Sequence, residues 1–211
     1  MSRIALISDV HGNLAGFNAV LADAEACGCD RMVCLGDLVD GGPDDAQVVR
    51  EIMARRIPCV RGNHDEINGL TLPPDIERYL ASLPEEMIEG DYYFTHISPR
   101  PKKNKIGGPI EAWNVFDEHP YRMMFFGHIH VPAVYGEKSS HAVTARDHKF
   151  QYQTPYALDR ADRYLICPGA IGYSRDQHQK IRYAIFDEAP WTIEIRMVEG
   201  PLLKIGRWFV D

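Results

Sequence analysis

The chain has 211 residues, of which 45% are hydrophobic and 25% charged, so we expect one globular domain spanning residues 1–211 with a sizeable core. The formal net charge of −7 argues against a protein that coats nucleic acid, although nuclease chemistry at a local site stays open. Five cysteines without a C-x-x-C pair form no disulfide framework, and no apolar run has the length of a signal peptide or membrane span. We therefore expect a soluble, cytoplasmic protein with no membrane partner; its oligomeric state stays open.

The N-terminal part of the chain predicts strands that alternate with helices. An apolar run at Ile4–Ile7 is followed by residues 14–26, where apolar side chains recur at helical spacing. A second strand is predicted at Met32–Leu35, a helix at Pro43–Arg56 and a third strand at Ile57–Val60. This order is typical of a βαβαβ unit with parallel strands.

The pattern changes along the rest of the chain. Two further buried strands are predicted at Tyr92–Thr95 and Met123–Phe126. Residues 137–162 are polar and predict either a hairpin or an extended loop. Short alternating runs predict an antiparallel sheet from Val131–Tyr135, Arg163–Cys167, Arg182–Phe186 and Ile193–Val198.

Five of the predicted strands end in Asp, His or Asn. The segments are SDVH at 8–11, GDLVD at 36–40, GNHD at 62–65, TH at 95–96 and GHIH at 127–130. Ligands of open α/β sheets bind beyond the carboxyl ends of the strands, so we expect these side chains to meet in one cleft. The candidate metal ligands are Asp9, His11, Asp37, Asn63, His96, His128 and His130.

The donor types narrow the choice of metal. Imidazole, carboxylate and amide oxygen donors without thiolates suit Mn, Fe, Zn or Ni, and we expect two divalent transition-metal ions with Mn²⁺ as the first choice. Seven donors are too many for one ion, but they suit two ions about 3.5–4 Å apart if one carboxylate bridges them. Each Asp or His alone could be a cap or turn residue, but that reading requires five strand ends to coincide by chance.

Taken in order, the five segments resemble the calcineurin-like metallophosphoesterases, and SDVHGNL is similar to their small bacterial and archaeal phosphodiesterase branch. The resemblance implies a four-layer α/β/β/α sandwich, in which two facing mixed sheets are flanked by helices. Ile97 departs from the family, which usually has Gly there. The family's pattern places Asp9, His11 and His130 on the first metal, Asn63, His96 and His128 on the second, and Asp37 as the bridge between them.

His64 exceeds the ligand count and is therefore free to act on the substrate. An imidazole beside two cations can protonate a leaving alkoxide, and the resemblance implies the same general-acid role. Its neighbour Asp65 could orient the ring by accepting a hydrogen bond. The alternative is that His64 only shapes the turn at Asn63.

The charges of such a centre favour phosphoester hydrolysis. With two divalent ions, Asp9, Asp37 and a bridging hydroxide, the centre carries about +1 and attracts a phosphate. We expect in-line attack by the metal-bridging hydroxide on a small phosphoester such as a nucleotide, with a phosphodiesterase favoured over a phosphomonoesterase or nucleotidase. Gly41 and Asp65 stand where protein phosphatases of the superfamily have Arg and Glu, which argues against a protein phosphatase. A non-catalytic scaffold or nucleotide-binding protein is the remaining alternative.

Other residues are candidates for supporting roles. Arg175 follows a PGAIG turn and could contact phosphate, or it could pair with Asp176. Lys103 lies in a basic segment with Lys102 and Lys105 that is either a lip for phosphate or a solvated loop. Asp40 could orient a ligand or cap the helix that follows, a role that Asp44 or Asp45 could equally fill. We expect the remaining histidines to be exposed, namely His119, His141, His148 and His178.

Overall fold

Two mixed β-sheets face each other, and the computed structural model describes them over residues 2–100 and 104–203. The first sheet has the strand order β2 (Arg31–Cys34), β1 (Arg3–Ile7), β10 (Ile181–Asp187), β11 (Thr192–Val198) and β8 (Tyr156–Ala157). β1 and β2 are parallel, whereas β10 lies antiparallel to β1 on its other side. Strands from the two ends of the chain therefore form the centre of this sheet.

The second sheet is built from the middle of the chain. Its order is β3 (Glu86–Glu89), β4 (Tyr92–Thr95), β5 (Met123–Phe125), β9 (Tyr164–Cys167), β6 (Ala133–Gly136) and β7 (Arg146–Asp147). The β4, β5 and β9 strands run parallel, and the remaining pairs are antiparallel. Like the first sheet, it is mixed.

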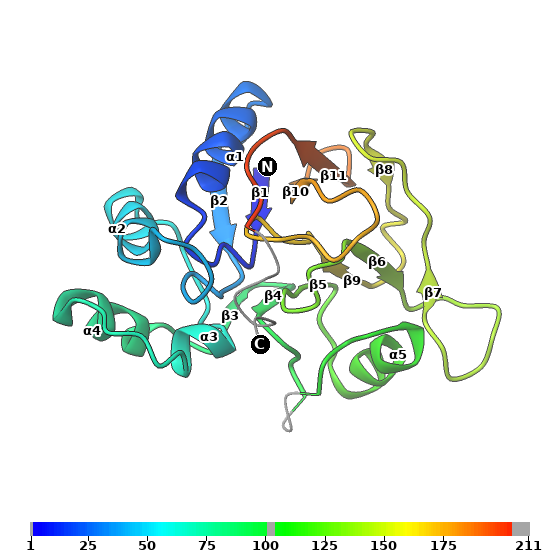
Figure 1. Ribbon diagram of the computed structural model, residues 1–211. Coiled ribbons are helices and arrows are strands. Elements are labelled where there is room, and N and C mark those ends of the chain that lie inside the picture. The colour runs from blue at the N-terminus through cyan, green and yellow to red at the C-terminus, as the bar shows by residue number, and fades with distance from the viewer. Residues whose placement is uncertain (1, 101–103, 204–211) are drawn as a thin grey trace.

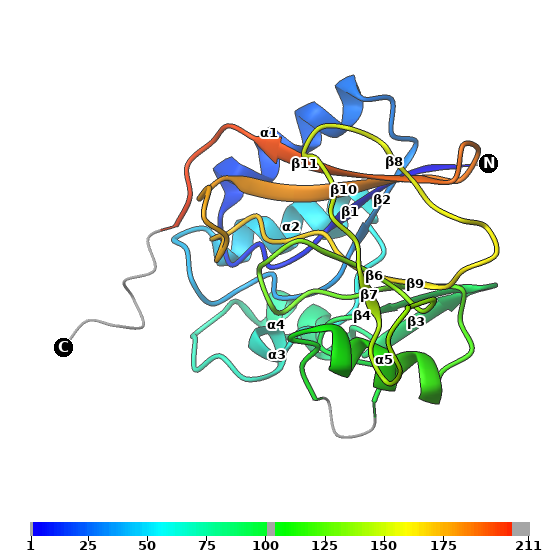
Figure 2. The same ribbon diagram turned by 90° about the vertical axis from the view of Figure 1, so that its right-hand side faces the viewer.

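Helices cover the outer faces of both sheets, as Figures 1 and 2 show. The first sheet packs against α1 (Leu14–Ala26), α2 (Asp45–Arg55) and α4 (Pro74–Ser82) through one apolar cluster. The second sheet packs against α5 (Pro109–Glu118) through another, and a third cluster fills the space between the sheets. These layers confirm the predicted four-layer α/β/β/α sandwich. Within the described ranges, every helix is too short or too polar to cross a bilayer.

The helix predicted at residues 14–26 has those bounds because its start is well defined. The Asn13 side chain accepts a hydrogen bond from the Gly16 N–H at 3.0 Å, which caps the first turn. Phe17, Val20 and Ala24 recur at helical spacing and are buried against the first sheet.

The structure corrects three predictions about strands. Residues 57–60 form only an isolated parallel bridge between Cys34 and Cys59, because Pro58 has no N–H to extend a ladder. The four runs after residue 130 are divided between the sheets, β6 and β9 in the second and β10 and β11 in the first. Residues 137–162 hold more than the predicted hairpin or extended loop, since β7 forms an antiparallel hairpin with β6 and β8 adds a further strand by pairing with β11.

Candidate metal centre

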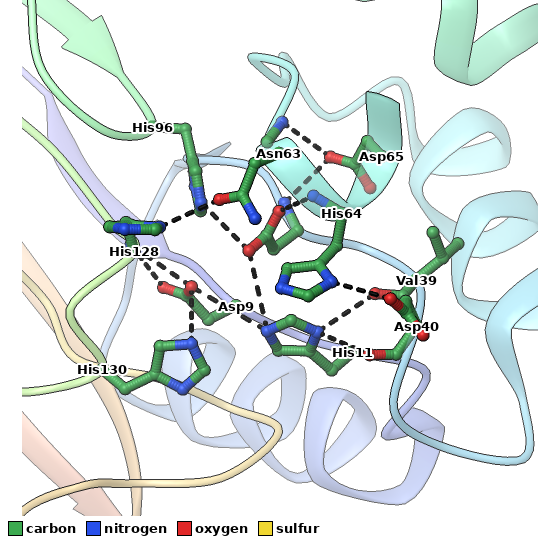
Figure 3. Close-up of polar contacts among 12 residues, drawn as sticks. Asp9, His11, Val39, Asp40, Asn63, His64, Asp65, His96, His128 and His130 are labelled. Carbon is green, nitrogen blue, oxygen red and sulfur yellow. Dashed lines mark hydrogen bonds and ion pairs between the residues drawn. The ribbon is translucent and has the colours of Figure 1, made fainter. Parts of the chain in front are cut away.

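All seven predicted ligands meet where strands of the two sheets end, and Figure 3 labels every one of them except Asp37 around a common space. Asp9 and His11 follow β1, Asp37 follows β2 and His96 follows β4 directly. His128 and His130 follow β5, and Asn63 begins the short helix α3 (Asn63–Glu66). The strand ends thus converge as the sequence predicted.

The ligand atoms fall into two groups that share one carboxylate. The potential ligand atoms of Asp9, His11, Asp37 and His130 lie within 4.8 Å of one another, and those of Asp37, His96 and His128 form a second such group. Asp37 belongs to both groups. This is the arrangement expected of a carboxylate between two ions.

The separations within each group are short. His130 Nε2 lies 3.1 Å from Asp9 Oδ1, and His96 Nε2 lies 3.0 Å from Asp37 Oδ2. Two atoms bound to one ion at about 2.1 Å are about 3.0 Å apart when the angle between them is near 90°. These separations therefore suit a shared cation. Asn63 Oδ1 joins the second group at 2.9 Å from His128 Nδ1.

Backbone carbonyls orient three of the histidines. Nδ1 of His11 lies 3.0 Å from the Val39 carbonyl, Nδ1 of His96 lies 2.6 Å from that of Leu35, and Nδ1 of His130 lies 2.8 Å from that of Tyr173. A carbonyl only accepts, so each Nδ1 is the donor, and each Nε2 is the nitrogen that can bind a cation once it carries no proton.

Five of the ligands have a left-handed backbone. The φ angles are 54° at Asp9, 50° at His11, 56° at Asp37, 70° at His128 and 59° at His130. Each such residue costs about 1 kcal/mol or more, although Asp, Asn and His tolerate this region better than other non-glycine residues. Main-chain hydrogen bonds between the loops after β1 and β2, such as Asp9 N–H to the Gly36 carbonyl at 2.9 Å, hold the conformation.

Three buried atoms of the centre lack a well-aligned hydrogen bond. They are His11 Nε2, Asp37 Oδ2 and His96 Nε2, all on side chains no more than 2% exposed. A buried polar atom without a good hydrogen bond costs about 1–3 kcal/mol, so three in one place need an explanation, even though His96 Nε2 and Asp37 Oδ2 lie 3.0 Å apart. A divalent cation bound by all three would provide it, and the residues present fit such an ion.

The electrostatics of the side chains also favour bound cations. Burial on its own would raise the pKa of Asp9, but the neighbouring histidines hold that pKa well below its usual range. Burial would lower the pKa of His96, but the charges of Asp37 and Asp9 raise it to about 10. The two buried carboxylates thus attract positive charge into the centre, and divalent ions would supply it.

His64 lies at the rim of the centre, and Asp40 contacts its ring. Nδ1 of His64 is 2.7 Å from Asp40 Oδ2, and the His64 side chain is 24% exposed. The Asp40 carbonyl also lies 3.1 Å from Nδ1 of His11. Asp40 therefore supports both the predicted general acid and a candidate ligand.

This arrangement corrects the prediction that Asp65 orients the His64 ring. The Asp65 carboxylate accepts hydrogen bonds from the backbone N–H groups of Gly62, Asp37 and Leu38 at 2.8, 2.9 and 2.8 Å. Burial, followed by the charge of Asp37, raises the pKa of Asp65 to about 6. Asp65 fastens the GNHD turn to the GDLVD turn and so positions two candidate ligands. Asp44 is at the N-cap position of α2 without a side-chain cap.

The other candidates have mixed outcomes. Lys102 and Lys103 lie outside the described residues. Asp176 pairs with Arg182 at 2.8 Å, so it is not the partner that would explain Arg175. Arg175 is exposed, and its backbone N–H donates to the His130 carbonyl at 3.2 Å.

Two features near the site were not predicted from the sequence. His148 was expected to be exposed but is 7% exposed, with Nδ1 2.8 Å from the Tyr156 hydroxyl. The Tyr173 carbonyl orients His130, a backbone role for which no side-chain pattern gives a signal. Only the PGAIG turn that precedes Tyr173 hinted that the backbone approaches the centre there, and Gly172 does pack against the Val10 carbonyl.

Comparison with known proteins gives consistent matches. Residues 2–189 match the model of the calcineurin-like phosphoesterase superfamily domain. An uncharacterized protein of Methanocaldococcus jannaschii is 33% identical over 228 residues, which cover 96% of this chain and 90% of the relative. A metallophosphoesterase structure from Sphaerobacter thermophilus has a TM-score of 0.81 and 32% identity, over 94% of this chain and 89% of that one. A hypothetical protein of Pyrococcus horikoshii, with a TM-score of 0.67, 16% identity and coverage of 95% and 89%, shares the fold.

Proposed function

The chain belongs to the calcineurin-like phosphoesterase superfamily of metal-dependent, phosphoester-cleaving hydrolases, and from that premise we propose that it is a two-metal phosphodiesterase. The observation that carries the proposal is the position of Asp37, whose carboxylate belongs to both groups of ligand atoms. His64 lies beside it, and the His64 backbone N–H donates to Asp37 Oδ1 at 2.8 Å. A shared carboxylate next to an accessible imidazole suits hydrolysis better than binding alone.

The residues divide between the ions as follows. Asp9, His11 and His130 would hold one ion, Asn63, His96 and His128 the other, and Asp37 both. Bound ions of this kind, with Mn²⁺ our first choice, supply Lewis acidity that neutralises phosphoryl oxygens and makes an attacking water acidic. The protein's own contribution is a rigid, buried donor set in which carbonyl hydrogen bonds and left-handed backbone fix each side chain before substrate arrives.

His64 would donate the proton that the leaving oxygen needs. Its ring is partly exposed at the rim and Nδ1 contacts Asp40, so we assign the proton donation to Nε2. In that arrangement the Asp40 carboxylate accepts a hydrogen bond from Nδ1 and sets the direction of the ring. Asp40 is thus a positioning residue for the general acid.

A diester suits the centre better than a monoester on two grounds. A diester carries a single negative charge, which a centre of about +1 neutralises. A cavity of about 610 Å³ adjoins His128 and offers room for a second ester group. Phosphomonoesterase activity is the second candidate, and the same assay separates the two.

The first test is hydrolysis of bis-p-nitrophenyl phosphate against p-nitrophenyl phosphate. Metal-stripped protein is reloaded in turn with Mn²⁺, Ni²⁺, Zn²⁺ and Mg²⁺, and bound metal is counted. We expect two ions per chain and faster release from the diester, with Mn²⁺ most effective. Faster release of p-nitrophenolate from the monoester would make the protein a phosphomonoesterase. If protein with two bound ions released none from either substrate, the proposal that it is an enzyme would be wrong.

The role of His64 is tested by the leaving group. A p-nitrophenolate leaves without a proton, whereas a phenolate without the nitro group benefits from one. We therefore expect His64→Gln to lower kcat about a hundredfold for a phenyl diester and only severalfold for the p-nitrophenyl diester. Equal losses for both substrates would assign His64 to the structure of the turn.

A further inference from the structure

The cavity next to the metal centre, called here the side cavity, has features that the reaction itself does not require. Its volume is about 610 Å³, and its lining includes His128 and Ile129 of the GHIH segment. A molecule whose phosphorus lies at the metal centre can therefore extend into the side cavity. Residues 147–152, which precede β8, line another wall of it.

An aromatic side chain in this wall is held by a buried ion pair. Arg182 is fully buried, donates from Nε to Asp176 at 2.8 Å, and lies with Cζ 4.6 Å from the centroid of the Tyr152 ring. The Tyr152 hydroxyl donates to the same Asp176 carboxylate at 3.2 Å. Burying a charge costs several kcal/mol unless it is well paired, and here the pair fixes the position of one ring. The Phe150 ring is nearly perpendicular to the Tyr152 ring, and the two ring centroids are 5.6 Å apart.

The lining of the side cavity is positively charged in an acidic protein. Its charged residues are Lys105, Lys149, Arg175 and Asp147, so three cations and one anion leave an excess of +2, whereas the whole chain carries −7. Lys149 pairs with Asp147 at 2.5 Å. Arg175 is tied to the metal centre, because its backbone N–H donates to the His130 carbonyl. Cations at this place favour an anionic ligand.

From this juxtaposition we propose that the side cavity binds the nucleobase and sugar of a nucleotide ester, with the base stacked on Tyr152. A fixed aromatic ring provides a stacking surface for any base, and Arg175 and Lys105 line the same cavity as His128, so their charges favour the phosphate of such an ester. The inference rests on the proposed function and deepens it, since it names the substrate class: nucleotide phosphodiesters.

The turnover test uses two diesters with the same leaving group. Thymidine 5′-(p-nitrophenyl phosphate) carries a base and sugar, and methyl p-nitrophenyl phosphate carries neither. We expect kcat/KM of the wild type to be about tenfold higher for the thymidine ester. Tyr152→Leu should remove this preference by raising KM for the thymidine ester. A wild type without preference, or a Tyr152→Leu variant that loses both activities equally, would overturn the inference.

A conservative variant separates stacking from structural damage. Tyr152→Phe keeps the ring over Arg182 but loses the hydroxyl that bonds Asp176, so we expect it to retain the preference. Arg175→Ala should weaken binding of both esters, because it removes charge and not a stacking surface. A Tyr152→Phe variant that behaves like Tyr152→Leu would assign Tyr152 to the hydrogen-bond network and overturn the stacking role.

A binding measurement distinguishes this inference from the proposed function. Isothermal titration of the Mn²⁺-loaded protein with adenosine 5′-monophosphate and with ribose 5-phosphate compares ligands that differ only by the base. Chromatography of both ligands afterwards checks that they are intact. We expect about tenfold tighter binding of the adenosine ligand, lost in Tyr152→Leu. If the protein binds the adenosine ligand more tightly but hydrolyses no diester, the proposed hydrolysis is wrong and the nucleobase site stands. If it hydrolyses diesters but binds both ligands equally, only the nucleobase site is wrong.

Discussion

The metal centre and the side cavity share His128 but are held in place in different ways. The centre's Asp and His side chains are almost all fully buried, and strained backbone and carbonyl hydrogen bonds fix them one by one. The side cavity uses exposed cations and half-buried rings, and the buried ion pair of Arg182 and Asp176 steadies the Tyr152 ring. If the proposed function is right, the reacting groups are held rigidly, and substrate choice is left to side chains that can change without disturbing them.

The largest expected effect comes from changing Asp37, which both halves of the metal centre share. Asn is nearly isosteric and tolerates the φ of 56° at this position, so Asp37→Asn removes charge without breaking the turn. We expect one ion to be lost on dialysis and kcat to fall at least about a thousandfold. Metal analysis and hydrolysis of bis-p-nitrophenyl phosphate measure both effects.

Asp44→Asn is the matched control for this change. Asp44 is exposed and its side chain makes no capping hydrogen bond, so both ions and full activity should remain. An Asp37→Asn variant that keeps two ions and wild-type activity would show that Asp37 does not link the metals.

The next prediction compares substitutions at two glycines, Gly127 and Gly107, neither of which has a positive φ. A Cβ added at Gly127 would lie 2.0 Å from Ser8 Oγ and 3.1 Å from Asp9 Oδ2, whereas one at Gly107, in the side cavity, meets only Lys105 Cε at 3.9 Å. We expect Gly127→Ala to lower the free energy of unfolding by about 1–3 kcal/mol, and Gly107→Ala by less than about 0.5 kcal/mol. Urea unfolding of metal-stripped protein measures both. Similar losses for the two variants would show that the centre is no more tightly packed than the cavity.

A smaller effect is expected from Asp40, which contacts the His64 ring. Asp40→Asn fits the left-handed φ of 71° and preserves the backbone carbonyl that orients His11. We expect metal content to be unchanged and kcat to fall about tenfold for a phenyl diester, but hardly at all for the p-nitrophenyl diester. A uniform loss for both leaving groups would argue that Asp40 only shapes the loop.

The smallest effect concerns the pH dependence of the side-cavity anchor. Burial would raise the pKa of Asp176, but Ser174 and the charge of Arg182 hold it below its ordinary value. Since the folded-state pKa is the lower one, the stabilisation is present above the unfolded pKa of about 3.9 and is lost as pH falls through the folded pKa.

Urea unfolding of metal-stripped wild type and Asp176→Asn checks this expectation. The wild type should be the more stable protein at pH 6, and its advantage should shrink steadily below about pH 4. An advantage that grows toward acid pH would have the wrong sign for a carboxylate stabilised in its charged form.

The convergence of the candidate ligands could be predicted from the sequence because each lies in a short local pattern. An apolar run followed by Asp, Asn or His marks a strand end, and five such patterns were enough to identify one edge of the sheets. The bounds of α1 were equally local, since Asn13 caps the helix at the point where the apolar spacing begins.

Relations between distant or adjacent residues were harder to predict. His64 and Asp65 are consecutive in α3, and consecutive helical residues do not face each other, so Asp65 points away from the ring it was expected to orient. The placement of β10 beside β1 depends on pairing across almost the whole chain. The side cavity combines residues from four separate segments, of which only GHIH carries a recognisable motif.

The insertion of β10 between β1 and β11 has a consequence for protein synthesis. Every candidate ligand lies at or before residue 130 in the chain. The strand that flanks β1, however, ends at Asp187, and the carbonyl that orients His130 belongs to Tyr173. A nascent chain that has emerged only to β6 therefore contains all the donors with β1 still an open edge. Since contacts of such sequence separation form late, metal capture should await release of the C-terminal hairpin from the ribosome.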